Sequence, residues 1–150
     1  MLAPRLVAYA TGRTGCRSTG EDVAQEALSA LVSHWRRFGA PESPEAFVFV
    51  IARRRAGRAV ARRALTGSLD WAMPVRARDQ GIESYEQRAE LLAVLATMRR
   101  LRRTDREVLL LRAAGELSLG EIAAVTGSSV AAVKMRLHRA RLRLRQLLEE

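Results

Sequence analysis

Arginine is the chemically active residue type that stands out in this chain. Of the 26 lysine and arginine residues, only Lys134 is a lysine. The guanidinium group presents a flat fork of hydrogen-bond donors that fits phosphate oxygens and the edge of guanine. A GC-rich genome would also explain the shortage of lysine, but it does not explain the formal net charge of +10. That charge indicates a polyanionic partner, and nucleic acid is the simplest one.

The groups that catalysis or metal binding would need are scarce. His34 and His138 are the only histidines and fall in different halves of the chain, and Cys16 is the only cysteine. One cysteine allows neither an intramolecular disulfide nor a cysteine-based metal cluster, and no G-x-x-x-x-G-K phosphate loop occurs. We therefore expect a protein that is not an enzyme and that uses no cofactor or metal ion. His34 is expected at a helix surface, and His138 towards DNA or solvent.

The segment from Ser118 to Leu148 predicts two helices joined by a tight turn. Ser118 and Glu121 match the S-x-x-E capping box, which satisfies free N–H groups at a helix start. Gly127 tolerates the left-handed backbone that ends such a helix. Ser129 can then cap the second helix.

The second of these helices has two different sides. Apolar side chains recur on one side at three- and four-residue steps: Val130, Val133, Leu137, Ala140, Leu144 and Leu148. The opposite side carries Ala131, Lys134, Met135, His138 and Arg139. This arrangement is typical of the recognition helix of a helix-turn-helix, which enters a major groove while basic groups contact phosphates. The alternative is an ordinary amphipathic helix pair with a solvated basic face.

The helix expected at residues 19–38 has an acidic side in a basic protein. Its predicted apolar face consists of Val23, Ala27, Leu28, Leu31, Trp35 and Phe38, and away from that face lie Asp22, Gln25, Glu26, Ser29 and Ser33. The second group is a candidate docking surface for a basic protein. A solvated helix face would show the same spacing.

The helix expected at residues 44–65, capped by Ser43, combines arginines with aromatic residues. Its arginines are Arg53, Arg54, Arg55, Arg58, Arg62 and Arg63, and its predicted inward face is Phe47, Val50, Ile51, Val60 and Ala61. Arginines can hold the backbone of a single strand while an aromatic ring stacks on its bases, which makes Phe49 a candidate. The alternative is that both Phe47 and Phe49 belong to the core.

Few prolines and many alanines, leucines and arginines predict an all-α protein. We expect two small helical domains, residues 1–65 and 85–150, joined by a linker at 66–84, and a C-terminal domain of four helices that contains the helix-turn-helix. Capping pairs at Ser18–Glu21, Ser84–Gln87 and Thr104–Glu107 predict three further helix starts, and Gly115 predicts a helix end. Both domains are net positive, which suits a protein that touches one polyanion at two places.

No apolar run approaches the roughly 20 residues that span a bilayer, and no secretory signal pattern opens the chain. We therefore expect no membrane insertion and a cytoplasmic location.

Three strings resemble the extracytoplasmic-function (ECF) sigma factors, which are small promoter-recognition subunits of RNA polymerase. The family's fourth region, with its R-E-V-L-x-L, E-I-A and V-K-x-R-L-x-R-A strings, is similar to REVLLLRAAGELSLGEIAAVTGSSVAAVKMRLHRARLRLRQLL. The acidic E-D-x-x-Q-E segment of its second region resembles EDVAQEALSALVSHWRRF. The following helix, with I-A-R retained, resembles FVFVIARRRAGRAVARRAL.

The resemblance implies that the chain binds core RNA polymerase and directs promoter recognition and transcription initiation. Residues 1–65 would be a sigma domain two, and residues 85–150 a sigma domain four. The segment that docks on the polymerase clamp helices is matched by Asp22, Gln25 and Glu26, and a contact with the polymerase flap is also implied. The −10 element would be bound by Phe49, Arg53, Arg54, Arg55, Arg58 and Arg62. The −35 element would be bound by Ser129, Ala131, Ala132, Lys134, Met135, Arg136, His138 and Arg139. Promoter DNA is thus an implied partner, and an anti-sigma factor is a further candidate.

The chain departs from the family at several positions. The usual threonine and serine around the valine–lysine pair are Ala132 and Met135, the asparagine and aspartate after I-A-R are Arg54 and Arg58, and a common tryptophan is Phe47. These changes leave the preferred DNA sequence open. Two other functions stay open as well: a stand-alone helix-turn-helix regulator, or a sigma-like decoy that docks on polymerase without initiating.

Overall fold

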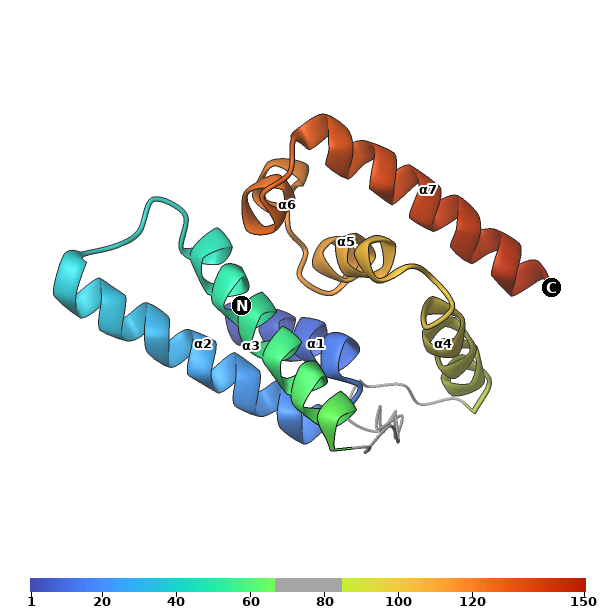
Figure 1. The fold of residues 1–150 in the computed structure, drawn as a ribbon, viewed down its shortest axis with the longest axis horizontal. Coiled ribbons are helices and arrows are strands. Elements are labelled where there is room, and N and C mark those ends of the chain that lie inside the picture. The colour runs from blue at the N-terminus through green and yellow to red at the C-terminus, as the bar shows by residue number, and fades with distance from the viewer. Residues whose placement is uncertain (67–84) are drawn as a thin grey trace.

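The computed structural model describes residues 1–66 and 85–150, without the side chains of Gln87, Arg88, Leu91 and Leu92. The predicted linker therefore lies outside the described residues apart from Thr66, and so does the capping pair Ser84–Gln87. The described part is all-helical, as predicted (Figure 1). Its helices are α1 (Leu2–Thr14), α2 (Arg17–Phe38), α3 (Pro44–Leu65), α4 (Tyr85–Met98), α5 (Arg103–Ala113), α6 (Leu119–Thr126) and α7 (Val130–Glu149).

Three helices begin where their capping residues predicted. The Ser43 hydroxyl accepts from the backbone N–H of Ala46 at 3.3 Å, and α3 follows. Ser118 and Glu121 form both bonds of the capping box at the start of α6. Ser129 accepts from Ala132 N at 3.1 Å and starts α7. These caps satisfy backbone donors that helix starts otherwise leave free.

Two other helix starts differ from the prediction. The first turn of α2 begins at Arg17, with Cys16 as the N-cap and no side-chain cap, so Ser18 already lies inside the helix. The first turn of α5 begins at Arg103, and Thr104 makes no cap with Glu107. Glu107 is instead buried with 6% exposure, because it contacts residues of another helix group.

Helix α5 ends at Ala113 with Ala114 as its C-cap, so Gly115 directly follows the helix end that it predicted. Glu116, not the glycine, has the positive φ of 53°. Gly115 is required for space: a Cβ atom there would lie 2.6 Å from the Leu111 carbonyl oxygen and 3.1 Å from Phe49 Cε1. A side chain at this position would push the α5–α6 turn away from α3.

The helices form two groups, which we call the N-terminal lobe (α1–α3) and the C-terminal lobe (α4–α7). Figure 1 shows α1, α2 and α3 packed together and α4 to α7 beside them. The lobes touch where α1 meets α5 and where α3 meets α6. Buried residues of both lobes, from Leu6 and Val48 to Leu111 and Val133, belong to one hydrophobic core cluster.

The buried faces of α2 and α3 differ in part from the predicted ones. Trp35 and Phe38 at the end of α2 are 49% and 69% exposed, because α2 extends beyond the helices that cover it. The buried face of α3 consists of Val48, Phe49, Ala52 and Ala56, while the predicted inward residues Phe47, Val50, Ile51 and Val60 are half-buried and Ala61 is exposed. Small residues at 52 and 56 let α3 approach its neighbours closely, which favours this rotation of the helix.

Candidate nucleic-acid interface

Helix α7 presents a basic face to solvent. Val133, Leu137 and Ala140 are buried against the rest of the C-terminal lobe, as predicted, and Leu147 is buried where Leu148 was expected. The opposite side is therefore open, and its exposed residues are Ala131, Lys134, Met135, His138 and Arg139. Met135 is 62% exposed, so its side chain is accessible on this face.

The turn between α6 and α7 fixes the angle of this face. Gly127 has φ 66° and closes α6, as predicted. Arg136 on α7 donates to the Ser128 hydroxyl at 2.8 Å and is half-buried. The hydroxyl of Ser129 is engaged in capping, and Ala132 is half-buried beside it. Arg136 and Ser129 thus hold the turn between α6 and α7 in place.

The arginines of α3 fall into three groups. Arg54, Arg58 and Arg62 are exposed. Arg55 pairs with Glu26 of α2 at 2.9 Å, and Arg63 donates to the Thr14 carbonyl oxygen at 2.8 Å. Arg53 crosses to the other lobe, where its Nε donates to Glu107 Oε1 at 2.7 Å. This hydrogen bond raises the pKa of Arg53 above its usual value.

The prediction that Phe49 contacts DNA is wrong for this structure. Its ring is fully buried and packs edge-on against Tyr9, with ring centroids 5.6 Å apart. A base could stack on Phe49 only if this ring also left its contact with Tyr9 of the same lobe. Phe47 is half-buried and lies beside His34, with ring centroids 4.6 Å apart.

The acidic side of α2 is exposed, as its spacing allows. Asp22, Gln25 and Glu26 all lie on the surface. Gln25 borders a groove that is lined by Val7, Ala24, Leu28 and Val32 together with polar side chains of α2. Asp22 and Glu26 border a second groove, which they share with Arg55, Arg58 and Arg62 of α3. The helical spacing indicated the acidic residues and placed Leu28 on the apolar face of this helix, but it indicated neither Ala24 nor Val32.

The described residues contain no helix that is long and apolar enough to span a membrane. Within the same ranges, no three His, Cys, Asp or Glu side chains gather as a metal site would require. His138 is exposed on α7, and His34 is half-buried against Phe38 and Phe47.

Comparison with known proteins identifies both lobes. Residues 1–66 match the model of sigma-70 region 2, and residues 91–144 match that of sigma-70 region 4. The two models together match four fifths of the chain. No curated protein sequence matches the chain.

Two solved structures share the fold. One is the sigma factor RpoE from Bartonella quintana in complex with the anti-sigma factor NepR, with a TM-score of 0.72 and 22% identity over 99% of this chain and 92% of that one. The other is CnrH in complex with the cytosolic domain of CnrY, with a TM-score of 0.66 and 25% identity over 97% of this chain and 80% of that one.

Region 2 precedes region 4 in the chain, as the numbering of the regions requires, and each match falls within one lobe. The sequence strings of the acidic helix and of the helix-turn-helix lie within these matches. The chain therefore belongs to the sigma-70 family and is an RNA polymerase sigma factor of the extracytoplasmic-function type.

Proposed function

We propose that this sigma factor recognises its promoter through two separate surfaces, α7 at the −35 element and α3 at the −10 element, while α2 binds core RNA polymerase. The observation that carries the proposal is the exposed basic face of α7 at the end of a capped helix-turn-helix. Such a face combines base contacts near the helix start with phosphate contacts further along.

On α7 the roles divide by side-chain chemistry. Lys134 and Arg139 are exposed cations that can neutralise phosphates. Ala131 and Met135 present apolar groups, which favour contact with a thymine methyl group over a hydrogen bond. His138 lies on the same exposed side and can meet the backbone.

On α3 the exposed Arg54, Arg58 and Arg62 can bind the strand that separates at the −10 element. Arg53 and Arg55 would join them once they release Glu107 and Glu26. Arginines that hold an unpaired strand stabilise the open state through binding energy alone, so no ATP is required.

On α2 the exposed Asp22, Gln25 and Glu26 are proposed to dock on the polymerase clamp helices. The carboxylates of Asp22 and Glu26 supply charge complementarity to a basic partner, and the groove beside Gln25 supplies apolar area around Val32. The polymerase flap is proposed as the contact of the C-terminal lobe.

An anti-sigma factor is a further proposed partner. It is supported by the two solved structures, since RpoE is in complex with the anti-sigma factor NepR and CnrH with the cytosolic domain of CnrY.

Run-off transcription with purified core polymerase, on DNA from upstream of the protein's own gene, tests the proposal. We expect a discrete transcript with the wild-type chain and none with a Lys134→Ala, Arg139→Ala double variant. Binding to core polymerase without any transcript would identify a decoy. Tight binding to duplex DNA without polymerase would identify a stand-alone regulator.

A further inference from the structure

Glu107 is a buried acid whose partners come from the opposite lobe. Its Oε1 accepts from Arg53 Nε at 2.7 Å and from the Tyr9 hydroxyl at 3.3 Å, and it lies 4.0 Å from Arg13 Nε. Burial raises the pKa of Tyr9, so the hydroxyl keeps its proton and stays a donor. Burying a carboxylate without partners would cost several kcal/mol of desolvation free energy. Glu107 avoids that cost only while the N-terminal lobe supplies its hydrogen-bond partners.

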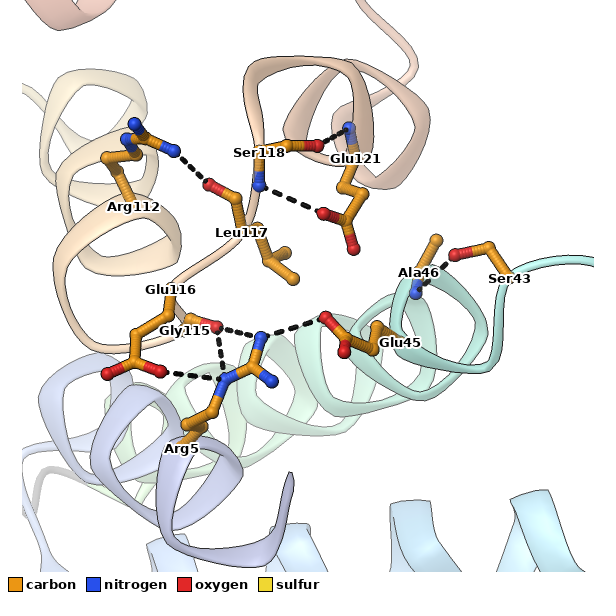
Figure 2. A network of polar contacts seen from close by, with 10 residues as sticks. All are labelled: Arg5, Ser43, Glu45, Ala46, Arg112, Gly115, Glu116, Leu117, Ser118 and Glu121. Carbon is orange, nitrogen blue, oxygen red and sulfur yellow. Dashed lines mark hydrogen bonds and ion pairs between the residues drawn. The ribbon is translucent and has the colours of Figure 1, made fainter. Parts of the chain in front are cut away.

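A second cross-lobe contact surrounds Arg5 of α1. Figure 2 shows its guanidinium between the α5–α6 turn and Glu45 of α3. Arg5 donates to the Gly115 carbonyl oxygen from Nε at 2.9 Å and from its terminal nitrogen at 2.7 Å. It also pairs with Glu45 at 2.9 Å and with Glu116 at 3.4 Å. Arg5 therefore ties α1 and α3 to the turn that precedes the helix-turn-helix.

Two glycines let the lobes come this close. A Cβ atom at Gly12 of α1 would lie 2.6 Å from Leu110 Cδ2 of α5. The Cβ atom missing at Gly115 would press on Phe49 of α3. The contact face is thus closely packed, and a side chain added at either glycine would press on a buried residue of the opposite lobe, Leu110 or Phe49.

Close to Glu107, arginines of the two lobes face each other. Arg106 of α5 has a lowered pKa, mainly through burial and then through the charges of Arg13, Arg103 and Arg99. Arg13 belongs to the N-terminal lobe, so like charges oppose each other across the contact. Removing the charge of Glu107 would leave cations facing cations.

We propose that Glu107 holds the two lobes closed in the free protein by occupying Arg53, an arginine that the −10 surface needs for promoter phosphates. A phosphate and a carboxylate make the same charge-assisted bonds with a guanidinium group, so DNA and Glu107 compete for one partner. The apparent affinity for promoter DNA then equals the affinity of the open form multiplied by the fraction of molecules that are open. Promoter binding and opening become linked.

Small-angle X-ray scattering of the full chain tests the closure without polymerase. We expect Glu107→Gln to increase the radius of gyration and Glu90→Gln, an exposed acid on α4, to leave it unchanged. Gly12→Leu is the second variant, because it adds a wedge at Leu110 while replacing a glycine inside α1 by a better helix former. Circular dichroism checks that both variants stay helical. A wild-type radius in both folded variants overturns the closure.

Promoter binding by the free chain, without polymerase, tests the competition, and this arm rests on the proposed function. We expect each opening variant to bind promoter DNA severalfold more tightly at low salt than the Glu90→Gln control. Arg53→Gln combined with Glu107→Gln should lose that gain. Open variants with unchanged DNA affinity overturn the competition. If no form of the chain supports transcription while the variants still open, the promoter function fails and the closure stands.

Discussion

Arg53 Nε and Glu107 Oε1 lie 2.7 Å apart and join α3, the helix proposed for the −10 element, to the C-terminal lobe, which carries α7. The Arg53 side chain is 40% exposed in this pair, so water and salt reach it. A pair of this kind is weakened by ionic strength, unlike the apolar contacts around Gly12. The contact between Arg53 and Glu107 can thus exchange partners, whereas the apolar contact around Gly12 cannot.

Charge reversal on α2 should weaken polymerase binding. Asp22→Arg places a cation where a basic partner is proposed to dock, so we expect at least a tenfold loss of affinity for core polymerase in a fluorescence-anisotropy titration, about 1.4 kcal/mol. Glu26 is a poorer choice, because its loss would also free Arg55.

The matched control for this prediction is Glu42→Arg in the loop between α2 and α3, which is exposed but lies away from Asp22. The role of α2 is refuted if both substitutions have the same effect.

Truncating one cation on α7 should change the salt dependence of promoter binding. Lys134→Ala removes one phosphate contact, so the slope of log affinity against log salt should fall by about 1. Anisotropy titrations at several salt concentrations measure it. Arg145→Ala, near the far end of α7, is the control and should change the slope less. An unchanged slope for Lys134→Ala would mean that this lysine faces solvent in the complex.

Phe49 should act on stability and not on DNA binding. Phe49→Ala removes a fully buried ring and is expected to destabilise the protein by about 3–5 kcal/mol in urea unfolding. Phe38→Ala, at a 69% exposed position, should change stability by about 0.5 kcal/mol or less. If Phe49→Ala changes stability only slightly and abolishes promoter opening, Phe49 contacts DNA and is not mainly a core residue.

Cys16 should react as a thiolate near neutral pH. Its pKa is lowered to about 6, first by the hydrogen bond with the Ser18 hydroxyl and then by Thr19, with burial acting in the opposite direction. The rate of alkylation by iodoacetamide should therefore reach half its maximum near pH 6, since the thiolate is the nucleophile.

Ser18→Ala should move that midpoint to higher pH, because it removes the largest stabilising contact of the thiolate. A midpoint near the pKa of a free thiol, about 8.5, in the wild-type protein would contradict this environment.

Local signals predicted what local interactions decide. Ser118 and Glu121 form a capping box as their spacing indicated, and the positions of α6, α7 and the exposed side of α7 followed from it. Thr104 and Glu107 have the same spacing and form no box, because Glu107 finds Arg53 and Tyr9 across the lobe contact. A partner that lies more than fifty residues away leaves no trace in a four-residue motif.

The rotation of α3 could not be predicted for a similar reason. Phe47 and Phe49 are two residues apart on a helix, so they face different directions, and either could have been the core residue. The choice depends on Gly115 and Tyr9, which supply the space and the ring that receive Phe49. The basic character of the surface, by contrast, followed from composition alone.

The hydrophobic core runs without interruption from Leu6 and Val48 to Leu111 and Val133, across the boundary between the lobes. Two folding units that share buried surface lend each other stability, and neither can melt without exposing part of the other. Calorimetry of the closed chain would accordingly record a single cooperative endotherm. Each lobe alone would have low thermal stability, and the shared core lets both unfold together at a higher temperature.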